Sequence, residues 1–398
     1  MTKPLDGIRI LDFSRVLAAP MATQILADMG AEVIKVERPG KGDETRSFEP
    51  RIGDESAYFF AFNRGKKSIT LDLRSDDDRH IVERLVNEVD VVVENFIPGT
   101  MDRYGLGWDR LHEINEQLIY VAASGFGQTG PERTRKGYDT VFQALSGVMH
   151  LTGEPESGPS KAGIPLADMT SGLWVAIAIL TGLVGRGAHG IGTFVDIAMM
   201  DVQTSLLALA AARTFALDDD PMRTGTAHLG RVPSAAFECR DGWVQISGSD
   251  QHWPLICEVL GLDDLVHDPR LATNSGRVER REEVTEALSA AISSWTRDQL
   301  VGALGEHGIP AGEVRTVKEA LNAPQTQARG MVGTFDHPTV GTFSALRTPV
   351  KFDSYDDPSI TVPPLLGADN EAVLGVFDPV GAVRTLGAVE PTGPEDPA

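Results

Sequence analysis

The sequence predicts an α/β protein whose larger part is a doubly wound parallel sheet. Short segments rich in Val and Ile alternate with helical segments through the first half of the chain. These segments are apolar on both faces, as strands are when helices cover both sides of a parallel sheet. After Met200 the pattern changes to a hairpin and amphipathic helices, which predicts a second, smaller α+β domain. We therefore assign residues 1–215 to a large domain, and residues 216–330 to linkers and the small domain.

Six strands are expected in the large domain, at residues 7–13, 33–37, 68–73, 91–95, 118–124 and 193–197. The first helix should begin near Pro20, a residue favoured in the first turn, and end at Gly30. Ser75 and the three acidic residues after it should cap the next helix, because a helix N-terminus favours negative charge. A long buried helix is expected over residues 168–184, and another helix over residues 201–212. This alternation predicts a Rossmann-like fold.

The second half is divided by segments rich in Gly and Pro. Residues 218–233 read as a linker, residues 235–247 as a hairpin, and amphipathic helices follow up to residue 321. Two further short strands are expected, at residues 333–335 and 341–346. The tail, residues 391–398, is expected to be disordered because its composition cannot form a core.

The charge of the chain limits its partners. Its 398 residues include 36 Lys and Arg against 57 Asp and Glu, for a formal net charge of −21. Such an acidic surface argues against a protein that coats nucleic acid. The longest apolar run, residues 173–184, is shorter than the roughly 20 residues of a membrane span, and charged residues interrupt any N-terminal signal peptide. We expect a soluble, cytoplasmic protein with neither a nucleic-acid nor a membrane partner.

The two cysteines, Cys239 and Cys257, support neither a disulfide framework nor a thiolate metal site, so no metal is expected. The sequence also contains no Walker A, G-x-S-x-G or H-E-x-x-H motif. ATP hydrolysis, serine hydrolysis and this type of zinc chemistry are therefore not indicated.

A dinucleotide-binding function is not indicated either, although Glu37 ends the second strand where such proteins carry a ribose-binding acid. The first turn between strand and helix, residues 14–20, contains no glycine, so its backbone cannot approach a pyrophosphate closely. One G-x-G-x-x-G occurs, at Gly185, Gly187 and Gly190. It follows a helix and precedes a strand, the reverse of the required order, and we expect a loop there.

Several distinctive stretches follow one another along the chain: RVLAAP at 15–20, LADMGAEVIKVERP at 26–39, NRGKKSITLD at 63–72, VENFIPG at 93–99, SGFGQTGP at 124–131, GYD at 137–139, and DPRLATN at 268–274 followed by Arg277 and Val278. Taken together, the chain resembles the class III CoA-transferases, which include formyl-CoA, carnitine and succinyl-CoA-dependent dicarboxylate transferases. The resemblance runs from about residue 5 to residue 370. It implies an enzyme that takes coenzyme A (CoA) and acyl-CoA as substrates and has no tightly bound cofactor.

The resemblance also implies roles for individual residues. The family nucleophile is an Asp at the start of a helix, followed by a small residue and Gly, and Asp168 in PLADMTSG, residues 165–172, matches it. The residues that match the family's CoA-binding positions are Val16, Ala18, Arg38, Asn95, Phe96, Arg103, Lys136 and Tyr138. Lys136 and Tyr138 match positions near the pantetheine and the thioester.

These residue types suit the chemistry of CoA. Its phosphates need Arg and Lys at discrete points, and Phe96 offers a flat face to adenine or to the pantetheine arm. Lys66 and Lys67 are either a solvated face or further CoA contacts. A carboxylate can attack a thioester to form a mixed anhydride, and we expect Asp168 to stay ionised beside a helix N-terminus.

The expected reaction passes through an aspartyl anhydride and an aspartyl-CoA thioester. The backbone N–H groups of Gly248 and Ser249 are expected to hold the developing oxyanion. Formyl-CoA transferases carry Gln where this chain has Leu17 and a glycine-rich run where it has residues 248–253, which disfavours formate and oxalate. We expect succinyl-CoA as the donor and a small, dicarboxylic acid as the acceptor.

Two alternatives stay open at this point. The 2-methylacyl-CoA racemases share the resemblance, but they carry His where this chain has Tyr138. A phenol with a reference pKa of about 10 is a poor substitute for imidazole in exchanging an α proton. A CoA-binding protein without chemistry is the second alternative, and the intact surroundings of Asp168 disfavour it.

The resemblance finally implies an architecture. Two subunits should interlock as a homodimer, each with an α/β domain, a small middle domain and a C-terminal segment, residues 331–390, that returns to the large domain. Residues 218–233 and 316–330 suit the two linkers.

Overall fold

The centre of the fold is a six-stranded parallel sheet. The computed structural model describes residues 2–375. The strands of the sheet are β1 (Arg9–Asp12), β2 (Glu32–Glu37), β5 (Lys67–Thr70), β6 (Val91–Glu94), β7 (Ile119–Ser124) and β8 (Thr193–Ala198). Their order is β5-β2-β1-β6-β7-β8 and every neighbouring pair is parallel. The chain therefore reverses its direction of winding between β1 and β6, where α/β proteins bind their ligands.

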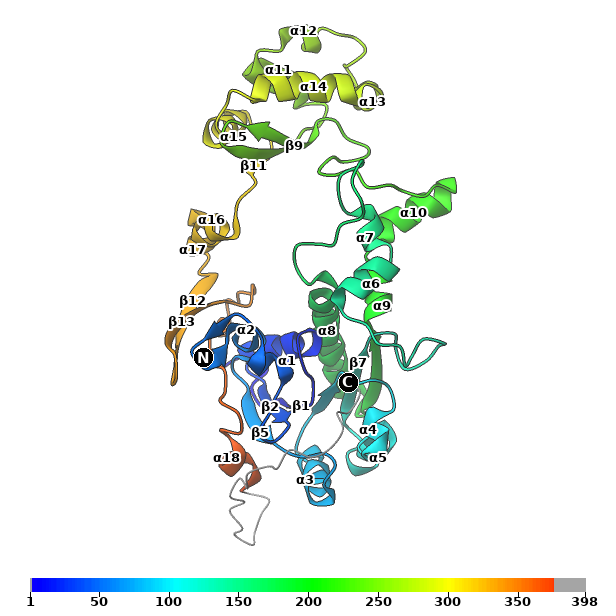
Figure 1. Ribbon diagram of the computed structural model, residues 1–398, viewed down its shortest axis with the longest axis vertical. Coiled ribbons are helices and arrows are strands. Elements are labelled where there is room, and N and C mark those ends of the chain that lie inside the picture. Colours follow the sequence, from blue (N-terminus) through cyan, green and yellow to red (C-terminus); the bar gives the residue numbers. More distant parts are fainter. Residues whose placement is uncertain (1, 376–398) are drawn as a thin grey trace. The chain divides into compact units, whose positions relative to one another are not determined.

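Helices cover both faces of this sheet, as the apolar strands predicted (Figure 1). One face, which includes Ile10 and Val33, packs on α1 (Ala18–Asp28) and α8 (Leu166–His189). The opposite face, which includes Leu11 and Ile34, packs on α3 (Asp76–Val86), α4 (Thr100–Arg103) and α5 (Trp108–Ile114). Ser75 caps α3 by accepting a hydrogen bond from the Asp78 amide, as expected.

The C-terminal part of the described chain packs on the N-terminal part. The hairpin of β12 (Val332–His337) and β13 (Gly341–Leu346) places Phe335 against Phe59 and Phe60 of α2 (Ala57–Asn63). The last helix, α18 (Asn370–Leu374), lies beside β5, where the Asn370 side chain accepts a hydrogen bond from the Thr70 amide. Smaller elements complete this part: η1 (Glu44–Ser47), β3 (Arg51–Ile52), β4 (Glu55–Ser56), α6 (Asp139–Leu145) and α9 (Met199–Ser205).

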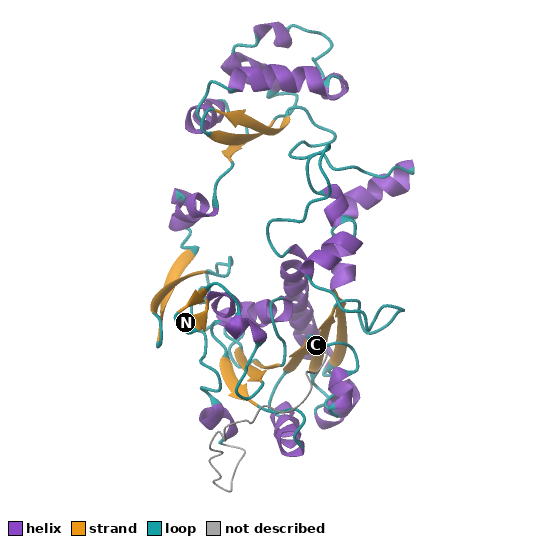
Figure 2. Cartoon of the chain, viewed as in Figure 1, coloured by secondary structure: helices purple, strands orange, loops and turns teal. Residues whose placement is uncertain are grey.

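A second unit is built on a three-stranded antiparallel sheet (Figure 2). Its strands are β9 (Ser234–Cys239), β10 (Gly242–Ser247) and β11 (Ala311–Glu313). Its helices are α11 (Trp253–Leu260), α12 (Asp263–Val266), α13 (Asn274–Glu279), α14 (Arg281–Ile292), α15 (Arg297–Glu306) and α16 (Val317–Asn322). Apolar side chains of β9, β10, α11, α14 and α15 form one core, which agrees with an α+β unit.

The chain thus forms two compact units. Within the described residues, the first comprises residues 2–148, 162–209 and those from 327 onward, and the second comprises residues 149–161 and 210–326. Three helices contain boundaries between these ranges: α7 (Val148–Leu151), α10 (Ala208–Leu217) and α17 (Pro324–Ala328). The tail at 391–398 lies outside the described residues, and so does the part of the predicted return segment after residue 375.

Three predictions about helices are wrong. The helix expected over residues 201–212 is two helices, α9 and α10, which are interrupted at Leu206 and Leu207. The expected glycine loop does not form at Gly185 and Gly187, which lie inside α8, while Gly190 ends that helix at φ +72°. This is the ordinary role of a glycine after a helix.

The third wrong prediction concerns the burial of α8. Val175 and Ile179 are buried in the core, but Trp174 is 45% exposed and Ile177 is 49% exposed. The prediction failed because it took an apolar composition to mean burial on all sides. With a mean hydropathy of 1.6 over 18 residues, α8 passes a length-and-composition test for a membrane span, as core helices of soluble proteins also do.

Candidate active site

The first turn of the sheet, after β1, is held in an unusual conformation. Val16 has φ +69°, a left-handed value that a β-branched residue rarely adopts. The side chain of Asn95, which follows β6, accepts a hydrogen bond from the Arg15 amide (2.8 Å) and donates one to the Arg15 carbonyl (2.7 Å). The two residues come from the strands on either side of the winding reversal. The turn is therefore built by the topology of the sheet and fixed by a side chain.

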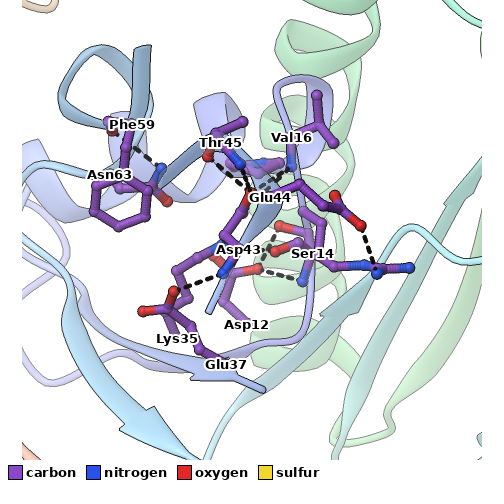
Figure 3. Close-up of polar contacts among 12 residues, drawn as sticks. Asp12, Ser14, Val16, Lys35, Glu37, Asp43, Glu44, Thr45, Phe59 and Asn63 are labelled. Atoms are coloured by element: carbon purple, nitrogen blue, oxygen red, sulfur yellow. Dashed lines mark hydrogen bonds and ion pairs between the residues drawn. The ribbon is translucent and has the colours of Figure 1, made fainter. Parts of the chain in front are cut away.

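Five buried charged side chains and the partly buried Arg46 lie near this turn; Asp12, Lys35, Glu37 and Asp43 are labelled in Figure 3. They alternate in sign and are Asp12, Lys66, Asp43, Lys35, Glu37 and Arg46. Lys66 donates to Asp12 at 3.0 Å, and Arg46 binds Glu37 through two nitrogens at 2.7 Å each. With three acids and three bases the group is electrically balanced, which is the condition for burying charge at this density.

Asp168 lies in the first turn of α8, where sequence analysis expects the nucleophile. The amides of Ala167 and Asp168 donate to the Oδ1 atom of Asp139, at 2.7 and 3.3 Å. The Oδ2 atom of Asp139 accepts a hydrogen bond from Gln143, whose own Oε1 accepts one from the Ala162 amide. Asp139 thus caps α8, so the carboxylate of Asp168 is not consumed as a helix cap.

A glycine brings the helix of Asp168 close to the first turn. A Cβ atom at Gly172 would lie 2.5 Å from the carbonyl oxygen of Ala18. Only glycine therefore allows α8 and α1 to pack at this distance. Gly172 is one helical turn after Asp168, and Ala18 is the first residue of α1. The contact couples the position of the candidate nucleophile to the turn that contains Val16.

The ionisation of Asp168 differs from the prediction. Burial raises the pKa of Asp168, and the nearby charge of Asp139 raises it further, to about 7. The helix N-terminus was expected to keep this carboxyl ionised, but desolvation and a like charge outweigh it. Tyr58 of α2 lies within the same electrostatic environment. Burial raises the pKa of Tyr58 to about 12, with contributions from Asp168, Asp43 and Asp139, so its hydroxyl stays protonated.

The structure brings part of the predicted CoA-binding set together. Val16, Ala18, Asn95 and Phe96 all lie around the ends of β1 and β6. The amide of Asn95 is occupied by Arg15, and the Arg15 guanidinium lies 4.8 Å from the centre of the Phe96 ring. Asn95 therefore acts on the turn, and one face of Phe96 is already covered.

The other predicted residues are on the surface. Arg38 is exposed just after β2, and Arg103 is exposed at the end of α4, where it donates to the Thr100 hydroxyl. Lys136 and Tyr138 are exposed just before Asp139, with Tyr138 76% exposed. These four side chains are accessible to a ligand, and the last two adjoin the residue that caps α8.

Two further expectations need correction. Lys66 belongs neither to a solvated face nor to an open binding site, because its side chain is fully buried against Asp12. The N–H groups of Gly248 and Ser249 are not free to hold an oxyanion in this structure. Gly248 donates to the Pro233 carbonyl at 2.8 Å and Ser249 to Nδ1 of His252 at 3.2 Å.

Three residues of the site were missed by sequence analysis: Asp139, Tyr58 and Asp43. Asp139 stands beside Tyr138 in a quoted motif, and that proximity was the available signal. For Tyr58 and Asp43, no motif or spacing in the sequence indicates a place in the site. Within residues 2–375, no group of three or more His, Cys, Asp or Glu side chains is placed to hold a metal ion.

Known proteins resemble this chain along nearly its whole length. It is 38% identical over 374 residues to the succinyl-CoA:glutarate CoA-transferase of Mus musculus, which covers 94% of this chain and 86% of the mouse protein. It is 36% identical to the succinate–glutarate CoA-transferase of Agrobacterium fabrum, across 96% of this chain and 98% of that protein. The chain is also similar to the crystal structure of a CAIB/BAIF family protein from Brucella suis, with 40% sequence identity and a TM-score of 0.86. The match covers 95% of this chain and 100% of the Brucella suis chain. The sequence also matches the model of CoA-transferase family III over residues 5–370. The chain therefore belongs to CoA-transferase family III and is an enzyme that transfers CoA.

Proposed function

We propose that this enzyme moves CoA from succinyl-CoA to a small dicarboxylic acid, with Asp168 as the nucleophile. The observation that carries the proposal is the placement of Asp168. Asp139 caps α8, so the carboxyl group of Asp168 is not needed as a cap. Asp168 lies one helical turn before Gly172, which contacts Ala18. The two curated relatives described above are named for succinyl or succinate and glutarate, which supports this donor and a dicarboxylic acceptor.

The proposed reaction proceeds through covalent intermediates on Asp168. The ionised carboxylate attacks the thioester carbonyl of succinyl-CoA, which forms an acyl-aspartyl anhydride and releases CoA thiolate. The thiolate attacks the aspartyl carbonyl of the anhydride, which gives aspartyl-CoA thioester and frees succinate. The acceptor carboxylate then attacks this thioester to form a second anhydride and release the thiolate again. Attack of the thiolate on the acceptor's acyl carbon yields the new acyl-CoA and restores Asp168.

Burial of Asp168 serves this mechanism in two ways. A partly desolvated carboxylate is a stronger nucleophile than a fully hydrated one, and a site that excludes water protects the anhydride from hydrolysis. Burial also raises the pKa of Asp168 to about 7, so this residue is protonated in a fraction of the enzyme molecules at neutral pH. An exposed aspartate would be ionised in almost every molecule at neutral pH, but an anhydride formed on it would be accessible to water.

The predicted CoA contacts fit a ligand with one charged end. We propose that the exposed Arg38 and Arg103 bind the phosphates, that Val16, Ala18 and Phe96 lie along the uncharged part, and that the exposed Lys136 and Tyr138 lie near the pantetheine and the thioester. CoA and acyl-CoA are substrates in this proposal, and no cofactor is tightly bound. The net charge of −21 makes such local basic groups necessary, because the surface as a whole repels a polyanion.

We further propose a cytoplasmic homodimer with interlocked subunits. Apolar side chains on α8 support a subunit contact: Leu173, Trp174 and Ile177 are between 45% and 49% exposed. These three side chains are close together along one helix, and contiguous exposed apolar patches are typical of interaction surfaces. Light scattering of the purified protein that gives a monomer would contradict the dimer.

The transferase proposal is tested by incubating the protein with succinyl-CoA and a panel of acids, followed by mass spectrometry of the acyl-CoA products. We expect a new dicarboxyl-CoA and free succinate, and loss of both with Asp168→Ala. Hydroxylamine should trap the wild-type enzyme at Asp168 after incubation with succinyl-CoA. Full exchange activity in Asp168→Ala would show that another residue is the nucleophile. Entry of solvent deuterium at the α carbon of a 2-methylacyl-CoA would support a racemase instead.

A further inference from the structure

The turn at Val16 is strained, so something must hold it. A left-handed backbone is unfavourable for an L-residue, and Val16 has a branched Cβ that makes φ +69° still less favourable. Such a conformation persists only where its surroundings fix it, and it is found mainly at functional positions. Val16 is also one of the positions proposed to meet CoA.

A buried ion pair spans this turn (Figure 3). The ammonium of Lys35 donates to the carbonyl oxygen of Ser14 at 2.7 Å and lies 2.9 Å from Oδ2 of Asp43. The two carboxylate oxygens of Asp43 accept the Val16 amide at 3.3 and 3.4 Å. Lys35 thus fixes the carbonyl of Ser14 at the start of the turn, and Asp43 fixes the amide of the strained residue, Val16. The bonds to Val16 are long, so their strength depends on the full charge of the acceptor.

The surroundings keep that charge in place. The side chains of Lys35 and Asp43 are 1% and 0% exposed. Burial alone would raise the pKa of Asp43, but the Lys35 ammonium and hydrogen bonds from Lys35 and Thr45 lower it to about 2. Asp43 also accepts the amide and the hydroxyl of Thr45, at 2.9 and 2.7 Å, which fixes the orientation of its carboxylate. The pair is therefore rigid as well as charged.

We propose that the Lys35–Asp43 pair is a positioning device for acyl-CoA binding. It holds Val16 in the left-handed conformation, so the turn is already formed when the ligand arrives, and the KM for acyl-CoA depends on it. Neither residue touches the reacting atoms, because both are buried beneath the turn. This inference rests on the proposed function through the assignment of Val16 to the CoA site.

The first test is Asp43→Asn, which keeps the shape of the side chain and removes its charge. We expect the KM for succinyl-CoA to rise roughly tenfold, because the turn must be reordered on binding, while kcat changes little. The matched control is Asp28→Asn. Asp28 forms another buried pair, with Arg64 at 3.2 Å, at the opposite end of α1. This control should lower the melting temperature without raising the KM.

Two more variants separate positioning from stability. Lys35→Met combined with Asp43→Leu removes both charges, so it should regain stability relative to Asp43→Asn, but its KM should stay high because the turn is still unsupported. Val16→Gly removes the backbone strain, and it should therefore make the KM much less sensitive to Asp43→Asn than it is in the Val16 background. A KM that follows the melting temperature across all variants, Asp28→Asn included, would overturn the proposal.

Direct binding distinguishes this inference from the proposed reaction. Calorimetric titration with CoA in an Asp168→Ala background measures the site without any chemistry. If the wild type exchanges no CoA, the proposed function fails, but Asp43→Asn should still weaken CoA binding roughly tenfold. If the wild type exchanges CoA but Asp43→Asn leaves the dissociation constant for CoA unchanged, the proposed function stands and the proposed role of the Lys35–Asp43 pair is wrong.

Discussion

The carboxylate of Asp139 accepts a hydrogen bond from the backbone amide of Asp168 at 3.3 Å while its charge raises the pKa of the Asp168 side chain. One residue therefore acts on Asp168 in opposite directions. It replaces Asp168 as the cap of α8, which leaves the nucleophile free. It also makes that nucleophile harder to ionise, because two carboxylates in a partly buried site repel each other.

The first prediction concerns pH and activity. Asp168 must be ionised to attack, so kcat/KM for succinyl-CoA should rise with pH through about 7. In Asp139→Asn the amide oxygen can still cap α8, but the negative charge is gone. The pKa of Asp168 should fall, and the rising limb of the profile should move to lower pH. A limb that stays in place would mean that burial, the larger cause, sets the pKa of Asp168 by itself.

The second prediction concerns pH and stability. The folded-state pKa of Asp168, about 7, lies above its ordinary value of 3.8. Ionising it therefore opposes folding, and stability is lost as the pH rises from about 4 to about 7 and stays lost above that. Asp168→Asn should raise the free energy of unfolding at pH 8 by on the order of 1–2 kcal/mol, a value reduced from the full shift because the side chain is partly solvated.

Urea unfolding of Asp168→Asn and the wild type at pH 8 and pH 4 measures this effect. The gain should shrink towards zero at pH 4, where the folded wild type is protonated. Asp54→Asn, in an exposed loop, is the control and should change little at either pH. Equal stabilisation by Asp168→Asn at both pH values would show that its origin is not ionisation.

The third prediction concerns the contact between α1 and α8. In Gly172→Ala the new Cβ would lie 2.5 Å from the Ala18 carbonyl oxygen, so the helices must separate. We expect a loss of about 1–3 kcal/mol in stability and a fall in kcat, because Asp168 moves relative to the first turn. Gly185→Ala, later in the same helix, meets no atom within 4 Å and should be neutral or stabilising, as alanine favours helix. Similar losses from both variants would contradict the packing argument.

The sequence was sufficient for the large elements because their signals are local. The apolar strands and the Ser75 cap each depend on neighbouring residues, and the structure confirms them. The position of Asp168 at the start of a helix was predictable for the same reason.

The details of the site were not predictable because they depend on distant residues. Val16 owes its conformation to Asp43, 27 residues away, and its neighbour Arg15 is held by Asn95, 80 residues away. The pKa of Asp168 depends on Asp139, 29 residues earlier in the chain. The helix-terminus argument for an ionised Asp168 considered one local effect, and the burial that outweighs it exists only in the folded chain.

The last prediction concerns Tyr58, whose hydroxyl shares an electrostatic environment with Asp168. Burial and then the charge of Asp168 raise the pKa of Tyr58 to about 12, so the phenol is a neutral hydrogen-bond donor wherever Asp168 is ionised. The two side chains are not hydrogen-bonded in this structure, but a neutral phenol that turns to donate to a carboxylate favours the ionised form of that carboxylate. We therefore expect Tyr58→Phe to move the rising limb of the kcat/KM profile to higher pH and to reduce activity at pH 7 more than at pH 9. Tyr104→Phe, another half-buried tyrosine that packs on the opposite face of the sheet, is the matched control and should leave the profile unchanged. If Tyr58→Phe lowers the rate equally at every pH, the hydroxyl acts on the substrate or on packing rather than on the ionisation of Asp168.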